Sequence, residues 1–521
     1  MAKAKKPATT KPAPKQPAPK QSPPKAKRAR AGDASSLLAQ ILATPDDRAL
    51  RLVYADQLID AGDPRGTFIS QQCTLEELDP LDERYAPMLA STHRLLATHG
   101  SVWIGGYDKR AKLAMIGRDP AGPLANAVFR GGFLERIAMA PEDIAKEWPR
   151  LRASEPIQGV ELTVSEQLDE AYRKLTEPRE FRVLKVTPSS WFTGNSAGNV
   201  LAWGMPDLYS LDLSGCDLGT DGARILANQP TDLATVFDDY VDPPPFAPGQ
   251  LRELILDSTN LGDDGARLVF AAAHLSSLEA LDLKGCRLTD SSTLEALRDA
   301  PAMRALVRLS LAGNNELGPH LGMLANWPVI PRLVALKLPQ TTTPAALRAL
   351  FPKPSAALRT LELPSAKALA AAPNIAEVAE ALVELDLGTT SLGDDRFSEL
   401  LAAPSVRRLL HLHVNGCSLS DAAIARLVAS PLDRLVTLDL SSNKLTDAGL
   451  QMLAGWDGLQ HVTHQRIGNN RKVTVAGIES LAGVAAAARL QPALLDVGKP
   501  ADRKLAERLR DQFGDVVVAS G

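Results

Sequence analysis

Leucines recur along most of this chain as L-x-L, followed by a small polar residue and one more apolar residue. The clearest copies are LDLSGCDLG at 211–219, LDLKGCRLT at 281–289 and LDLSSNKLT at 438–446. Because side chains alternate along a strand, both leucines enter a core while the residue between them faces solvent. The phrases that follow, such as TDGARILA at 220–227, begin with a capping residue and continue with apolar residues at helical spacing. Each unit is therefore predicted to be a strand, a turn and a helix.

The first leucine of each unit measures the length of the repeat. Successive gaps are 27, 43, 27, 28, 27, 25, 24, 27 and 26 residues, so the period is close to 27 with one exception. A period held over nine gaps indicates an array of stacked units, and the long gap indicates an insertion at 228–250. We expect about 10–12 units within 157–488. The leucines are Leu184, Leu211, Leu254, Leu281, Leu309, Leu336, Leu361, Leu385, Leu412 and Leu438.

This repeat resembles the leucine-rich-repeat family in its long form, which has a full helix in each unit. The resemblance implies an α/β solenoid, with parallel strands on the concave face and helices on the convex face. The small polar position turns the chain inward, where an amide or hydroxyl hydrogen-bonds backbone and a thiol fills the same slot. Its cysteines are thus expected to be buried and free, which points to a reducing compartment and a cytoplasmic location. The position holds Cys216, Thr259, Cys286, Asn314, Thr390, Cys417 and Asn443.

Residues 33–156 do not repeat and are expected to form a helical domain that caps the first unit. Helices are predicted over SLLAQILA, after Pro45-Asp46-Asp47, and from about Gly66 to Leu78. The segment TPDDRALRLVYADQLIDAGDPRGTFISQQC at 44–73 is similar to the repeat-companion domain of bacterial leucine-rich-repeat proteins, and 93–106 and 129–137 resemble its continuation into the first repeats. Gln57 departs from that pattern, which usually has an aromatic residue there. The resemblance implies no enzymatic activity. Residues 489–521 are expected to cap the far end with a helix and a strand.

Charge divides the chain into a basic tail and an acidic body. Residues 1–30 hold ten Lys and Arg and no acid, which leaves 48 basic and 61 acidic residues in the remainder. Residues 1–32 are rich in Lys, Pro and Ala and are expected to be disordered. They are either a solvated tail or a nonspecific contact to nucleic acid. The start of the chain lacks the apolar core of a secretory signal, and no membrane span is expected.

Two sets of residues are candidates for binding a partner. The concave set is acidic in the main, so it favours a basic protein over a phosphate backbone. The second set lies in the insertion, because insertions in solenoids emerge as loops. The concave candidates are Lys185, Asp212, Asp282, Lys337, Glu362, Asp386, His411, His413 and Asp439. The insertion candidates are Phe237, Asp238, Asp239 and Tyr240.

Catalytic and metal-binding patterns are weak. GNSAG at 194–198 fits the hydrolase motif G-x-S-x-G, but the repeat frame places Ser196 at the start of a convex helix, which is the wrong context. His411, His413 and Asp439 share one face and are more readily explained as solvent-facing side chains than as metal ligands. We therefore expect no cofactor, no metal and no catalysis. The sequence predicts a monomeric scaffold that binds an unknown, basic protein; the alternative is a nucleic-acid-associated protein tethered by residues 1–32.

Overall fold

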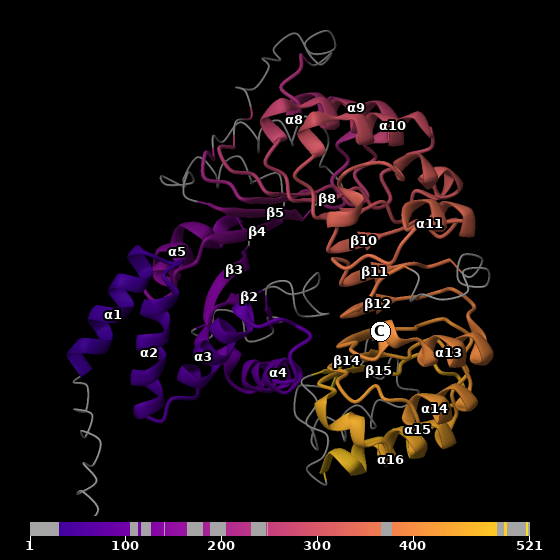
Figure 1. The fold of residues 1–521 in the computed structure, drawn as a ribbon. Helices are drawn as coiled ribbons and strands as arrows, with labels where there is room; N and C mark the ends of the chain where they lie inside the picture. Colours follow the sequence, from indigo (N-terminus) through magenta and orange to yellow (C-terminus); the bar gives the residue numbers. More distant parts are fainter. Residues whose placement is uncertain are drawn as a thin grey trace, which may run out of the picture.

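A single curved sheet runs through the molecule, with helices along its outer side (Figure 1). The computed structural model describes residues 31–104, 113–115, 127–139, 141–163, 181–187, 205–230, 246, 248–365, 378–486, 494–496 and 517–518. Within these ranges the sheet has 17 strands, and each strand pairs with the next one in the chain.

The strands follow chain order, and neighbours are parallel except for the antiparallel pair β2–β3. The first five are β1 (Leu113–Met115), β2 (Ala127–Arg130), β3 (Phe133–Met139), β4 (Gly159–Thr163) and β5 (Val183–Thr187). They are followed by β6 (Ser210–Asp212), β7 (Glu253–Ile255), β8 (Ala280–Asp282), β9 (Arg308–Ser310), β10 (Ala335–Lys337) and β11 (Thr360–Glu362). The last six are β12 (Glu384–Asp386), β13 (His411–His413), β14 (Thr437–Asp439), β15 (His464–Arg466), β16 (Leu494–Asp496) and β17 (Val517–Val518).

Helices precede the sheet and then occupy its convex side. The N-terminal group is α1 (Ala31–Ala43), α2 (Arg48–Asp60), α3 (Pro64–Glu77), α4 (Tyr85–Trp103) and α5 (Pro141–Arg152). The repeats contribute α8 (Gly219–Leu226), α9 (Gly262–Ala271), α10 (Ser292–Asp299), α11 (Pro344–Leu350), α13 (Gly393–Ala402), α14 (Asp421–Val428), α15 (Asp447–Ala454) and α16 (Val475–Ala486). Short 3-10 turns connect some of them: η4 (Ala273–Leu275), η5 (Pro301–Met303), η6 (Asn315–Leu324), η7 (Ile330–Arg332), η9 (Pro404–Val406) and η10 (Asp457–His461).

The repeat frame predicted from the leucines is confirmed by the register of the strands. Leu184 pairs with Leu211, and the series continues without a slip to Leu412 with Leu438. None of these ten side chains is more than 2% exposed. Burying a leucine stabilises a fold by roughly 1.5–3 kcal/mol, so the row of leucines is a major part of the core. The solenoid with parallel strands inside and helices outside is thus the fold of this chain.

The small polar position bonds each unit to its neighbour. Asn314 Nδ2 donates to the carbonyl of Leu283 at 2.8 Å, and its Oδ1 accepts from the amide of Leu288 at 3.0 Å. Where a cysteine stands there, the thiol donates to the same carbonyl position, as in Cys286 Sγ to the Leu256 carbonyl at 2.9 Å. All four cysteines are free and buried. Burial raises the pKa of Cys216 to about 12 and of Cys286 to about 11, so these thiols are inert.

A second set of bonds links helix starts on the convex side. Thr446 caps α15 by accepting from the Ala448 amide, and its own hydroxyl donates to Asp421 of the preceding helix at 2.6 Å. Asp394 accepts from Ser420 in the same way, as does Asp447 from Thr474. Each aspartate accepts a hydrogen bond from the residue that caps the next helix, so these helices stabilise one another as a series.

The N-terminal region differs from the expected helical domain over 33–156. Helices α1 to α3 lie close to where they were predicted, but β1, β2 and β3 also belong to this region, and β3 already pairs with β4 in parallel. The sheet therefore begins before residue 157. Strand β3 lacks the small polar position, which is why the leucine pattern does not detect it. The β2–β3 turn requires Gly131 and Gly132, whose φ angles are 53° and 84°, because a Cβ there would strike Arg51 and Ile69.

Several predicted features lie outside the described residues. These are residues 1–30 of the tail predicted over 1–32, the motif at 194–198, and Phe237, Asp238, Asp239 and Tyr240 of the insertion. The last two residues of the predicted tail lie in helix α1 instead. The described base of the insertion is closed by Asn228, which donates to the Phe246 carbonyl at 2.8 Å and accepts from its amide at 2.6 Å. At the far end, β16 and β17 extend the sheet within the segment that was expected to cap it.

Candidate functional site

The residues between paired leucines form a row that crosses the concave face, and we call it the concave row. Register places them side by side from β4 to β15. The row holds six acids and three permanent cations, so the acidic balance predicted from the sequence is present in the structure. Its members are Glu161, Lys185, Asp212, Ile255, Asp282, Ser310, Lys337, Glu362, Asp386, His413, Asp439 and Arg466.

Aspartate recurs in this row for a local structural reason. Oδ1 of Asp212 accepts from the amide of the residue two positions later at 2.9 Å, and Asp282 and Asp386 do the same at 2.8 Å. The bond secures the chain as it leaves the strand. Each such bond uses one carboxylate oxygen, so the negative charge still faces the concave side. These acids were predicted only as binding candidates, and their structural role in the turn was not predicted.

The strongest concentration of charge lies on β8 to β12 around Lys337. Lys337 Nζ lies 3.6 Å from Glu362 Oε2, with both side chains partly exposed at 42% and 21%. Burial opposes the charge of this lysine, but Glu362 and the more distant Asp282 outweigh burial and raise the pKa of Lys337. Beside it, the hydroxyl of Ser310 is buried and has no hydrogen-bond partner among the described residues. This stretch therefore offers carboxylates and one unused hydroxyl.

Two candidate residues at the ends of the row, Lys185 and Asp439, lie in ion pairs with other residues of the row. Lys185 Nζ lies 3.1 Å from Glu161, and each side chain is only 14% exposed. Asp439 is 5% exposed, accepts from the backbone and hydroxyl of Ser441, and lies 3.7 Å from Arg466. Asp439 is therefore not a surface contact residue, in contrast to its sequence-based assignment. Glu161 and Arg466 were missed because their strands lack the full leucine pattern.

The two histidines of β13 face the concave side as predicted. His411 Nδ1 lies 3.0 Å from the Thr437 hydroxyl, and His413 Nε2 lies 4.0 Å from Glu384. Glu384 stands one position before the row and was not among the candidates, although the same register would have found it. Within the described ranges, no group of three or more His, Cys, Asp or Glu side chains is arranged to hold a metal.

One end of the concave face is covered by the N-terminal helix α4, which contacts η10 and β15. Thr463 is fully buried at this contact, and its hydroxyl lies 2.8 Å from His93 Nδ1 and 3.1 Å from His464 Nδ1. The two imidazole rings meet edge to face with centroids 4.4 Å apart. Burial and the charges of His411 and Arg466 lower the pKa of His464 to about 3, so this ring is neutral at pH 7. We call this contact the joint.

Polar contacts flank the joint on its solvent side. Arg94 of α4 donates to the Gln460 carbonyl at 2.9 Å. Arg434 donates to the carbonyls of Pro80, Leu81 and Asp82, in the loop before α4. Nothing in the repeat pattern or the capping signals indicated that segments more than 350 residues apart meet here. The joint was therefore not predictable from these patterns.

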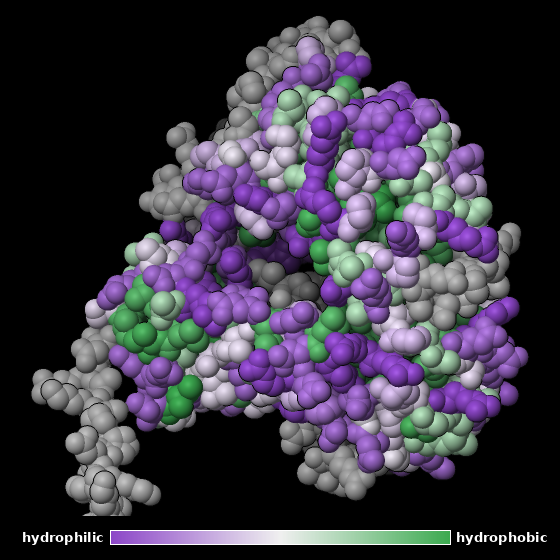
Figure 2. All heavy atoms as spheres, in the orientation of Figure 1, coloured by the Kyte–Doolittle hydropathy of each residue, from purple (hydrophilic) through white to green (hydrophobic). Residues whose placement is uncertain are grey.

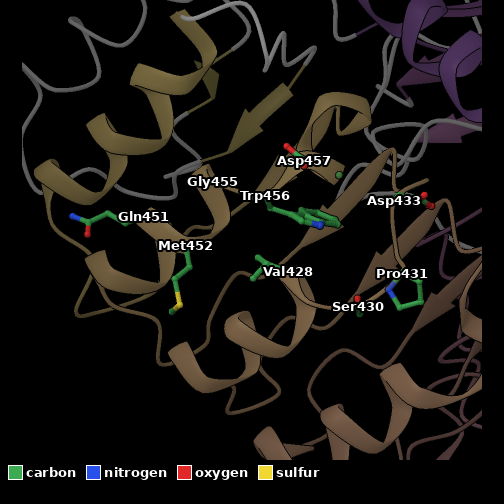
Figure 3. Close-up of a pocket in the computed structure, with 10 residues that line it drawn as sticks. Val428, Ser430, Pro431, Asp433, Gln451, Met452, Gly455, Trp456 and Asp457 are labelled. Atoms are coloured by element: carbon green, nitrogen blue, oxygen red, sulfur yellow. The ribbon is translucent and has the colours of Figure 1, made fainter.

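A shallow cavity of about 520 Å³ lies beside the joint, between α14 and α15 (Figure 3). Trp456 points into it, and Met452 and Val428 line it from the two helices. Asp433 and Asp457 stand at its edge, while the neighbouring Arg434 reaches the N-terminal domain. The cavity brings together no set of groups with evident chemistry.

Comparison with known proteins agrees with this geometry. The family model described as Leucine Rich repeat matches residues 205–227, 274–292 and 435–454, which fall on strand–helix units of the array. The chain therefore contains leucine-rich repeats. No helix in the described part of the chain is both long and apolar enough to cross a membrane.

The chain spans less than two thirds of the length of two curated relatives that it matches. It is 28% identical over 292 residues to the ribonuclease inhibitor of Sus scrofa, which covers 47% of this chain and 60% of the relative. It is 29% identical over 277 residues to NACHT, LRR and PYD domains-containing protein 12 of Mus musculus, covering 44% of this chain and 26% of the relative. Among solved structures, the complex of Rad7 and Elc1 in yeast aligns at a TM-score of 0.47 and 17% identity, over 73% of this chain and 85% of that one.

Proposed function

We propose that this protein is a non-enzymatic scaffold that binds a basic protein through its concave row. The observation that carries the proposal is the partly exposed acidic stretch on β8 to β12, where carboxylates outnumber cations and face away from the core. Opposite charge steers a basic partner and excludes a phosphate backbone. The name of the ribonuclease inhibitor, which is similar in part, indicates binding to another protein, and we extend only that general role to this chain.

The N-terminal domain fits the role of a cap in this scaffold. Its hairpin β2–β3 continues the sheet, and its helices cover the side at which the array begins. An uncovered strand edge would invite pairing with other chains. We infer that the domain is related to the repeat-companion domain of bacterial leucine-rich-repeat proteins, and that the protein works in a reducing, cytoplasmic setting because its cysteines are free.

The test neutralises charge without disturbing the fold. Asp212, Asp282 and Asp386 are replaced together by Asn, which keeps an oxygen to accept the local backbone bond. We expect an unstructured lysine-rich peptide to bind about tenfold more weakly to this variant, since exposed ion pairs contribute roughly 0.2–1 kcal/mol each. The measurement is calorimetric titration at low salt and again at high salt, where the difference should shrink.

A matched control carries the same change of net charge on the convex side, with Asp264, Asp299 and Asp395 replaced by Asn. These three residues are exposed on α9, α10 and α13. We expect this control to bind the peptide as the parent chain does. Equal affinities for both triple variants, or an affinity indifferent to salt, would show that the concave row does not select a basic partner.

The second candidate function is association with nucleic acid through the basic tail. Ten Lys and Arg within residues 1–30 favour contact with phosphates, and such contact weakens steeply as salt rises. We expect any binding to DNA or RNA to disappear when residues 1–32 are deleted, as measured by fluorescence anisotropy over a salt series. Absence of nucleic-acid binding by the full chain removes this candidate, and peptide binding that survives the deletion assigns recognition to the body.

A further inference from the structure

The described backbone traces a closed contour around the concave face. We propose that this protein is a ring whose inner face takes a single unfolded, basic polypeptide segment entering end-on, and that the joint excludes folded partners. The basic charge expected of the partner rests on the proposed function. The requirement that the partner be an unfolded segment rests on the joint. Figure 2 shows a recess near the centre of the molecule, and the described residues at its rim include many hydrophilic and some hydrophobic ones.

Two sets of side-chain contacts made by α4 close the contour. On one side, Phe68 of α3 stacks on Trp103 of α4 at 4.7 Å and meets Phe129 of β2 at 5.9 Å, so α4 is fixed to the start of the sheet. On the other side, His93 of the same helix reaches Thr463 and His464 at β15. Helix α4 therefore bridges the two ends of a continuous series of paired strands from β2 to β15.

The joint is built as an interior contact rather than as a surface contact. His93, Thr463 and His464 are at most 5% exposed. Opening the joint would expose their packed faces to water and break the bonds from Arg94 and Arg434 to backbone carbonyls. Both sides of the joint also belong to elements that are anchored independently, since α4 packs on α3 and β15 pairs with β14. Closure is thus the arrangement that buries these groups, and separation of the two sides need not unfold either one.

The size of the ring decides which partners can pass. Fourteen strands at about 4.8 Å give roughly 60 Å of contour. The ten residues of α4 between His93 and Trp103 add about 15 Å, and the two packing contacts add about 10 Å each. A contour of about 95 Å encloses a circle roughly 30 Å wide between backbones, or about 20 Å between side-chain tips that each reach about 5 Å inward. A 100-residue domain, with a radius of gyration of about 13 Å, is too wide for the space between the described strands, whereas a single extended chain is narrower than that space.

The lining of the hollow decides the chemistry of the segment. The concave row carries six acids against three cations, and each cation already faces one acid: Lys185 faces Glu161, Lys337 faces Glu362 and Arg466 faces Asp439. The row therefore offers its other three acids, Asp212, Asp282 and Asp386, to lysine or arginine side chains that run along it. A nucleic-acid strand of similar width is disfavoured by the same charges.

Closure is tested first, with spin labels on the full chain. Ser101 on α4 and Lys472 beyond β15 are both exposed and are replaced by Cys for labelling. The four native cysteines are buried with raised pKa values and stay unlabelled. Pulsed electron resonance should give one narrow distance distribution, which lengthens by more than about 10 Å when His93→Glu places a charge in the joint. A broad distribution in the parent, or no change with either His93→Glu or Arg434→Glu, overturns the closed ring. Ala97→Glu, on the exposed side of α4, is the matched control and should leave the distance unchanged.

Threading is tested with two probes that share one lysine-rich segment of about 12 residues, which spans roughly 40 Å when extended. One probe carries a folded domain at a single end, and the other carries a folded domain at both ends. We expect the two-ended probe to associate with the parent at least 100-fold more slowly than the one-ended probe, and to recover its rate with His93→Glu. Equal rates for both probes on the parent overturn threading while leaving the concave-row scaffold intact. If neither probe binds the parent or His93→Glu, the proposed function itself fails, and the spin-label distances still report whether the ring is closed.

Discussion

Replacing Asn443 by Ala is expected to lower the free energy of unfolding by about 3 kcal/mol, because it leaves several buried backbone groups without hydrogen-bond partners at once. The Asn443 side chain donates to the carbonyls of Val414 at 2.8 Å and Leu440 at 3.0 Å, and it accepts from the Leu419 amide at 3.0 Å. It is 7% exposed, so water cannot replace these bonds without opening the repeat. Urea unfolding followed by circular dichroism measures the loss, and hydrogen exchange at the Leu419 amide locates it.

Asn443→Cys is the informative comparison. Cysteine occupies the equivalent slot at Cys417, where the thiol donates to the Leu387 carbonyl at 3.1 Å. A thiol therefore keeps one of the three bonds and fills most of the volume, and we expect about half of the loss caused by Ala. Equal losses for Ala and Cys would mean that the hydrogen bonds that only the amide makes, and not packing, govern this position. A loss below about 0.5 kcal/mol for Ala would show that neighbouring units already stabilise the turn.

The repeat itself was predictable because the residues within each unit determine the structure of that unit. Leucine alternation sets the strand, the small polar residue sets the turn, and capping residues such as Ser420 and Thr446 begin the helices. Nearest-neighbour stacking then follows from the shared period. The same locality explains what was missed at the ends. Strand β3 lies in a segment that was recognised only by its resemblance to a family, and Gln465, which takes a leucine position in β15, lies in a degenerate last unit whose register was ambiguous.

The accessibility of the site residues was less predictable than the register of the strands that carry them. Register alone places Asp212, Asp282 and Asp386 on the concave face, and the structure agrees. Whether such a residue is accessible to a partner depends on contacts that the spacing of residues in the sequence does not reveal. Asp439 is buried, and Ser441 and Arg466 occupy its carboxylate. The joint between α4 and β15 was likewise not predictable from spacing, because a contact between segments so far apart depends on the accumulated curvature of the array, which is a property of all units together.

The N-terminal cap depends on one buried ion pair, and removing one partner is expected to have the largest effect on stability in that domain. Glu155 is 2% exposed at the side chain, and both of its oxygens lie 2.7 Å from Arg65 Nη2. It also accepts from the Leu134 amide at 2.9 Å, so it ties α3 to the hairpin strand β3. The Arg65 guanidinium lies 5.0 Å from the Phe133 ring, which leaves it little water. We expect Glu155→Ala to lower stability by about 3–5 kcal/mol, because it leaves this cation buried without its partner.

The matched variants separate charge from packing at this ion pair. Arg65→Met combined with Glu155→Leu removes both charges while keeping volume, and we expect it to be more stable than Glu155→Ala alone, since no buried charge is left unpaired. Glu399→Gln removes one partner of the exposed pair Arg396–Glu399 on α13 and should leave the unfolding midpoint unchanged. Thermal and urea unfolding measure all three variants. If Glu155→Ala and the double variant lose stability equally, the Leu134 bond rather than the uncompensated cation accounts for the effect. Because α3 and β3 hold the helix that forms the joint, a real loss at Glu155 should also broaden the distance between labels at Ser101 and Lys472, which links the stability of the cap to the closure of the ring.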